Sequence, residues 1–140
     1  MPVFKVLYIK EFYSNATPET HNESDHNIII LYDDLDATFY YYGTRARESD
    51  SKKKYIDYSG SYSYDAFQNF NDFLKYLLDG NRALITNELY EIHISENEYT
   101  HLSFSKLKAK FFKGALLSAY DLQPNKGTYL EGLLSMLINY

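Results

Sequence analysis

Few side chains in this sequence could do acid–base or metal chemistry, and their spacing matches none of the common catalytic or metal-binding patterns. The four histidines are His21, His26, His93 and His101. His21 and His26 are five residues apart in a polar stretch, which suits no single face of a helix or strand. The chain has no cysteine, no serine-centred nucleophile motif and no glycine-rich phosphate loop. We therefore predict no catalytic residue, no metal site and no cofactor, and a protein that is not an enzyme.

Acidic residues and tyrosines gather in one short stretch that suits binding better than catalysis. Asp33, Asp34 and Asp36 predict a turn, because aspartate side chains satisfy neighbouring backbone groups. Tyr40 and Tyr42 follow in a run of β-forming residues. Carboxylates steer a basic partner towards a surface, and tyrosines supply contact area there. We predict that these five residues bind a protein with a basic groove, such as a nuclease or another nucleic-acid-handling protein. Further acids that could extend this face are Glu48, Asp50, Asp57, Asp65 and Asp72.

A second interpretation rests on basic residues that follow the same tyrosines. These residues are Arg45, Arg47, Lys52, Lys53 and Lys54. Aromatic rings stack on nucleotide bases while cations meet phosphates, so the segment is also typical of a small nucleic-acid-binding module. Two acids within the segment and the net charge of −5 for the whole chain weigh against this interpretation.

The composition bears on the source of the chain. Sixteen tyrosines accompany no cysteine and no tryptophan. Tyrosine, phenylalanine, isoleucine, asparagine and lysine are all encoded by AT-rich codons, and their abundance is typical of AT-rich bacteria, phages and large DNA viruses. Small proteins that block host nucleases, and immunity proteins that neutralise toxins, dock acidic surfaces on basic grooves. We therefore predict an inhibitor or sequestering factor of the anti-defence or immunity type, from a phage, virus or mobile element.

The sequence also predicts a cytoplasmic protein, or one in the host cytoplasm or nucleus if it is viral. Without cysteine there is no disulfide framework. Lys5, Lys10 and Glu11 interrupt the apolar run at the N-terminus, so no signal peptide is expected. No apolar stretch approaches the ~18–20 residues that cross a bilayer, so no membrane partner is expected.

The apolar pattern predicts a single α+β domain over residues 1–140, a length that fits one domain. Strand-like runs precede most of the helical ones, which favours a mainly antiparallel, hairpin-connected sheet of five or six strands. The predicted strands are residues 3–9, 28–32, 37–45, 55–64, 83–86 and 89–95. The predicted helices are residues 66–79, about 104–120 and 128–139. Residues 14–27 and 46–54 are predicted to be loops, and Asn87-Glu88 a turn.

Periodicity predicts which side chains are buried. In the helix 66–79 the apolar stripe is Phe67, Phe70, Phe73, Leu74 and Leu77. In the strand 55–64 the inner face is Ile56, Tyr58, Tyr62 and Tyr64. In the strand 37–45 we expect Phe39 and Tyr41 inside, with Tyr40 and Tyr42 outside beside the acidic turn. The alternative is that helices cover both faces of this strand.

Overall fold

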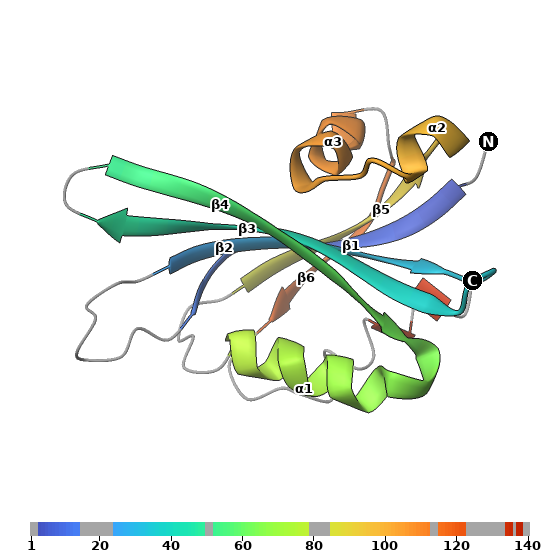
Figure 1. Ribbon diagram of the computed structural model, residues 1–140, viewed down its shortest axis with the longest axis horizontal. Helices are drawn as coiled ribbons and strands as arrows, with labels where there is room; N and C mark the ends of the chain where they lie inside the picture. The colour runs from blue at the N-terminus through green and yellow to red at the C-terminus, as the bar shows by residue number, and fades with distance from the viewer. Residues whose placement is uncertain are drawn as a thin grey trace.

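The computed structural model describes residues 3–14, 24–49, 52–78, 85–112, 115–122, 134–135 and 137–138. Within them, six strands form one antiparallel sheet in the order β4-β3-β2-β1-β5-β6. The strands are β1 (Val3–Ser14), β2 (Ser24–Asp33), β3 (Thr38–Ser49), β4 (Lys52–Ser63), β5 (Ile85–His93) and β6 (Ala115–Leu122). The helices are η1 (Tyr64–Ala66), α1 (Phe67–Leu78), α2 (Glu96–Tyr99), α3 (Phe104–Ala109) and η2 (Lys110–Phe112). The predicted α+β class, the antiparallel pairing and the strand number are confirmed (Figure 1).

Helices cover both faces of the sheet (Figure 1). Helix α1 packs on one of them, which we call the α1 face. There Phe39, Leu7 and Ile30 join Phe70 and Leu74 of the helix in one buried cluster. Leu134 and Leu137 pack into the same cluster from the C-terminal segment, where the described residues are helical. The remainder of the predicted helix 128–139 lies outside the described residues.

Helices α2 and α3 lie on the opposite side of the sheet, which we call the α3 face. Ile29, Leu31 and Ile92 are buried there with Phe104 and Leu107 of α3. The odd and even positions of β2 are therefore both buried, as a sheet covered on two sides requires.

Aromatic rings fill the α1 face between the sheet and α1. Phe70 lies 5.3 Å from Phe39, 5.9 Å from Tyr41 and 5.0 Å from Tyr62, measured between ring centroids. The α1 stripe is thus confirmed at Phe70 and Leu74, which are buried, while Phe67 and Phe73 are half-buried. The side chain of Leu77 lies outside the described ones.

Two glycines make room for the tyrosines of this layer. A Cβ atom on Gly43 would lie 2.2 Å from Cζ of Tyr58, and one on Gly60 would lie 2.3 Å from the hydroxyl of Tyr41. Each ring therefore lies across the backbone of the neighbouring strand, where any larger residue would displace it. The predicted inner face of β4 is confirmed at Tyr58 and Tyr62.

At the ends of β4 the burial prediction was wrong. Ile56 is 40 % exposed because the β3–β4 hairpin extends past the helix, and Tyr64 is 49 % exposed because it begins η1.

The predicted loops were too long. Residues 24–27 belong to β2, and residues 46–49 and 52–54 extend β3 and β4. Arg47 of β3 is paired with Ser24 of β2 and with Lys54 of β4. The backbone N–H and C=O groups of the three strands therefore bond to one another here, and this pairing does not depend on the polarity of the side chains. Residues 15–23 and 50–51 lie outside the described residues.

The Asn87-Glu88 turn was wrong, because residues 85–93 form one strand. Glu88 lies opposite Tyr8 on one side and Ala119 on the other, so β5 is paired along both edges. The hydroxyl of Tyr90 donates to the carboxylate of Glu88 at 2.5 Å, which gives that acid a partner within the strand. Residues 83–84 lie outside the described residues.

The helix predicted at about 104–120 was right only in its first part. Helix α3 ends at Ala109, η2 at Phe112, and residues 115–122 form β6. Residues 115–122 form a strand and not a helix because they pair with β5, which thereby gains a second neighbouring strand.

Candidate functional site at the acidic turn

The acidic residues lie at the turn that joins β2 to β3. Asp33 ends β2, and its Oδ1 accepts a hydrogen bond of 2.9 Å from the backbone N–H of Leu35. The hydroxyl of Thr38 donates to the carbonyl oxygen of Asp36 at 2.9 Å. Ala37 has φ of 49°, the only positive value for a non-glycine among the residues described. Its carbonyl oxygen accepts from the backbone N–H of Tyr64 at 2.7 Å, which ties the turn to the start of η1.

Asp33 also ties the turn to a distant helix. Tyr99 of α2, 66 residues further along the chain, donates its hydroxyl proton to Asp33 Oδ2 at 2.5 Å. Burial, followed by this hydrogen bond and by the charge of Asp33, strongly raises the pKa of Tyr99. The phenol therefore stays protonated and remains a donor through the neutral pH range. Asp33 itself is only 6 % exposed.

The two tyrosines of the predicted site lie on the α3 face of β3, packed against its buried cluster. The hydroxyl of Tyr40 donates to Asp36 Oδ2 at 3.3 Å, and its ring meets the edge of Tyr99 at 6.2 Å between centroids. Tyr42 is half-buried against the buried cluster of the α3 face. Burial raises the pKa of Tyr42, and the neighbouring Tyr40 makes a smaller contribution in the same direction. The alternative that helices cover both faces of β3 is thus the correct one. Phe39 is buried and Tyr41 half-buried on the other face, as expected.

What remains at the surface is a short, fixed segment. Asp34 and Asp36 are exposed, and Leu35 between them is 93 % exposed. We call Asp34, Leu35 and Asp36 the acidic tip. Asp33, placed by the sequence in the same binding set, supports the tip from below. Leu35 was missed, although a large apolar residue at the centre of an acidic turn was the available signal. Tyr99 had no signal in the sequence.

The other acids named from the sequence belong to other elements than the tip. Asp57, Asp65 and Asp72 are exposed but belong to β4, η1 and α1 respectively. Asp65 directly follows Tyr64, whose N–H donates to Ala37 at the end of the turn, so Asp65 is close along the chain to a residue that contacts the turn. The side chains of Glu48 and Asp50 lie outside the described ones.

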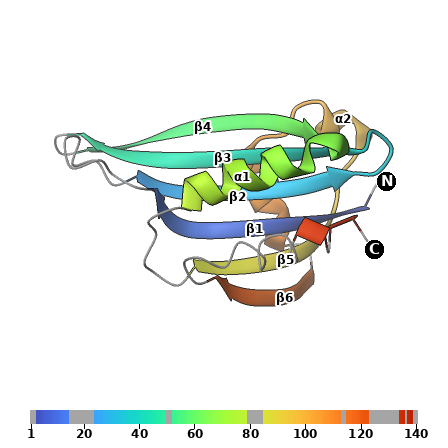
Figure 2. The same cartoon turned by 90° about the horizontal axis from the view of Figure 1, so that it is seen from below.

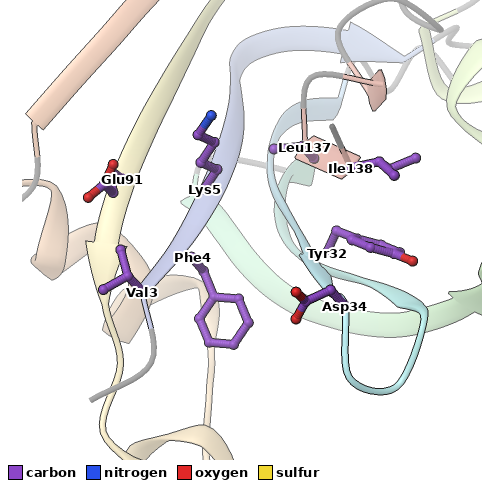
Figure 3. A pocket seen from close by; sticks show the side chains of 8 residues that line it. All are labelled: Val3, Phe4, Lys5, Tyr32, Asp34, Glu91, Leu137 and Ile138. Carbon is purple, nitrogen blue, oxygen red and sulfur yellow. The ribbon is translucent and has the colours of Figure 1, made fainter. Parts of the chain in front are cut away.

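A small hollow of about 180 Å³ opens beside the acidic tip (Figure 3). Asp34 and Tyr32 line one side of it, Lys5 and Glu91 another, and Leu137 and Ile138 a third. Burial lowers the pKa of Lys5, and the neighbouring carboxylate of Glu91 partly opposes that effect. The hollow is thus lined by the carboxylates of Asp34, next to the end of β2, and Glu91, near the end of β5. It has room for one side chain of another molecule.

The basic segment lies at the far end of the same strands. Arg45 and Arg47 are on β3, and Lys52, Lys53 and Lys54 are on β4, paired so that Arg47 lies opposite Lys54. Since β3 runs for 12 residues from the turn, this end lies roughly 35–40 Å from the acidic tip. The structure brings these five residues onto adjacent strands but keeps them apart from the acidic set. Their side chains lie outside the described ones.

The histidines form no site among the residues described. His93 and His101 are both exposed. Over the described part of the chain, no group of three histidine, cysteine, aspartate or glutamate side chains could hold a metal ion. No helix in that part is both long and apolar enough to span a membrane.

Comparisons of the chain with protein-family models, with characterised proteins and with solved structures find no match.

Proposed function

We propose that the chain is a non-enzymatic protein-binding domain that inhibits or sequesters a partner by docking the acidic tip on a basic groove. The observation that carries this proposal is the set of hydrogen bonds that fixes the tip before any partner arrives. Tyr99, Thr38 and Tyr40 each contribute one of them. A turn held in one conformation loses little conformational entropy on binding, so more of the contact energy appears as affinity.

The chemistry of the tip indicates a basic partner. Asp34 and Asp36 attract a positively charged surface and raise the rate of encounter. A single exposed leucine is common on protein surfaces. Leu35, however, is held between two carboxylates, so a partner that meets the charges also buries the leucine, which is worth about 1.5–3 kcal/mol. Nucleases and other nucleic-acid-handling proteins carry basic grooves of the required kind. An anti-defence or immunity protein of a phage, virus or mobile element would act in this way.

The test compares matched variants of the full chain. Beads carrying the wild-type chain, Asp34→Asn/Asp36→Asn or Asp57→Asn are incubated with extract of the native host, and captured proteins are identified by mass spectrometry. Asp57 is an exposed acid on β4, so its variant shows the effect of removing one carboxylate that lies outside the tip. We expect a basic protein that the wild type and Asp57→Asn capture and the double variant does not. Titration calorimetry of that protein should then show affinity that falls with ionic strength. Equal capture by the double variant would refute the role of the tip.

The second candidate is direct nucleic-acid binding by the basic segment. It is favoured by the strand register, which places Arg45 and Arg47 on the strand next to Lys53 and Lys54. Titration of labelled single- and double-stranded DNA and RNA at low and moderate salt separates the two candidates. Tight binding that weakens steeply with salt, and is lost in Arg47→Ala/Lys54→Ala, would support this second function against the first.

A further inference from the structure

Strand β4 is the last strand of the described sheet, and its outer edge is long and regular. It is hydrogen-bonded to β3 over 12 residues without any register shift, and no described residue pairs with its other side (Figure 2). Proteins usually protect such an edge by making it short, by a bulge or by proline. β4 has none of these, although its first three residues are lysines.

The hydrogen bond at the end of the hairpin shows which backbone groups face outwards. The N–H of Tyr64 donates to the carbonyl oxygen of Ala37, so Tyr64 directs its N–H towards the β3 side of the hairpin. Hydrogen-bonding direction alternates along an antiparallel strand. The N–H and C=O groups of Ser59, Ser61 and Ser63 therefore point to the free edge. All three side chains are small and exposed, so they do not block the approach of another strand.

The charges along this edge fit the same edge of a second molecule. Lysines begin β4, and Asp65 follows its end. Two copies in antiparallel pairing bring the basic start of each strand to the acidic end of the other. The two ends of the β3–β4 hairpin also differ in charge, because the basic segment is at one end and the acidic tip is next to the other. Antiparallel pairing of two copies therefore brings opposite charges together at both ends.

We propose that two copies of the chain pair through β4 in antiparallel fashion and form one continuous sheet, with Ser59 opposite Ser59 of the second copy. This register uses the outward-facing backbone groups of both strands. It brings the lysines at the start of each β4 to the end of the other β4, where η1 with Asp65 follows, and it places the exposed Ile56 opposite Tyr62 of the second copy. A register shifted by two residues towards the start of the strand would place Asp57 opposite itself, which charge repulsion opposes. The proposal does not depend on the proposed function, because it involves no other protein.

Single cysteines test the register directly, because the chain has none of its own. Opposite residues of a hydrogen-bonded antiparallel pair have Cα atoms about 5.5 Å apart, which a disulfide can bridge. Ser59→Cys should therefore give a covalent dimer within minutes of mild oxidation. Ser61→Cys is the matched control, since its two copies would lie about 14 Å apart along the paired strands. Ser105→Cys, exposed on α3, measures random collision. Cross-linking of Ser61→Cys or Ser105→Cys as fast as that of Ser59→Cys would overturn the proposal.

The mass of the full chain in solution tests the dimer without any cross-link. Analytical ultracentrifugation over a range of concentrations should show a dimer for the wild type and for Ser61→Ala. Ser61→Pro removes an N–H that points to the free edge and none that bonds to β3, so it should be a folded monomer by circular dichroism. If that variant fails to fold, the cysteine series still decides the question. A monomeric wild type at every concentration would overturn the proposal and leave the edge to a strand of another protein.

Discussion

The hydrogen bond between Tyr99 and Asp33 should contribute measurably to stability, and Tyr99→Phe removes it while keeping the ring. The ring stacks on Phe4 at 5.8 Å and meets Tyr40 at 6.2 Å between centroids, and both contacts survive the substitution. What is lost is one donor to a carboxylate that is only 6 % exposed. The substitution thus removes the polar contact between α2 and the β2–β3 turn and leaves the packing of the ring in place.

The expected loss is about 1.5–2 kcal/mol. Hydrogen bonds to charged groups contribute about 1.5–3 kcal/mol. The lower part of that range applies, because Asp33 keeps its bond from the N–H of Leu35 and is not left without a partner. For a domain of this length the same loss lowers the melting temperature by roughly 5–8 °C.

Urea denaturation followed by circular dichroism measures the loss, with Tyr55→Phe as the matched control. Tyr55 is 64 % exposed, so removing its hydroxyl should change the free energy of unfolding by less than about 0.5 kcal/mol. If Tyr99→Phe were no less stable than Tyr55→Phe, Asp33 would not be a supporting residue and the account of how the tip is fixed would be wrong.

Three other substitutions test the packing and the ionisation described above. Phe70→Ala should cost about 3–5 kcal/mol in urea denaturation, because Phe70 is fully buried among three aromatic rings; a loss below 1 kcal/mol would contradict that packing. Gly60→Ala should cost about 1–3 kcal/mol, since the new methyl group would overlap the Tyr41 ring, whereas Ser59→Ala on the preceding residue should be neutral. Burial, then the hydrogen bond to Glu88 and its charge, raises the pKa of Tyr90 to about 12. A raised pKa of this kind stabilises the fold fully below pH 10, and that contribution is lost between about pH 10 and 12, so Tyr90→Phe should flatten the alkaline fall in stability relative to wild type.

Local periodicity predicted the elements that depend on their own residues. Helix α1 was found because its apolar stripe repeats at helical spacing, and Phe70 is buried where that repeat places it. Strands β2 and β3 were found from β-forming runs, and the turn between them from aspartates that bond to nearby backbone. These signals lie within a few residues of the structure that they predict.

Elements that depend on distant partners could not be predicted in this way. Residues 115–122 form a strand because β5 lies beside them, and no local pattern carries that information. Residues 87–88 continue β5 because strands flank them on both sides. In the candidate site the same limit applies to Asp33, whose role depends on Tyr99, 66 residues away. The acids were recognised as a group, but which of them is buried was decided by a contact across the fold.

The strand order has a consequence for synthesis of the chain on the ribosome. Strands β1 to β4 pair with their neighbours in sequence, so this half of the sheet can assemble as soon as it emerges. β1, however, needs β5 on its other side, and β5 begins only at Ile85. Until then, the side of β1 that later pairs with β5 is open along the apolar residues from Val6 to Ile9. Open strand edges of this kind promote aggregation of nascent chains. A stalled or truncated product that ends at Leu78 should therefore aggregate, although its helix and four of its strands are present.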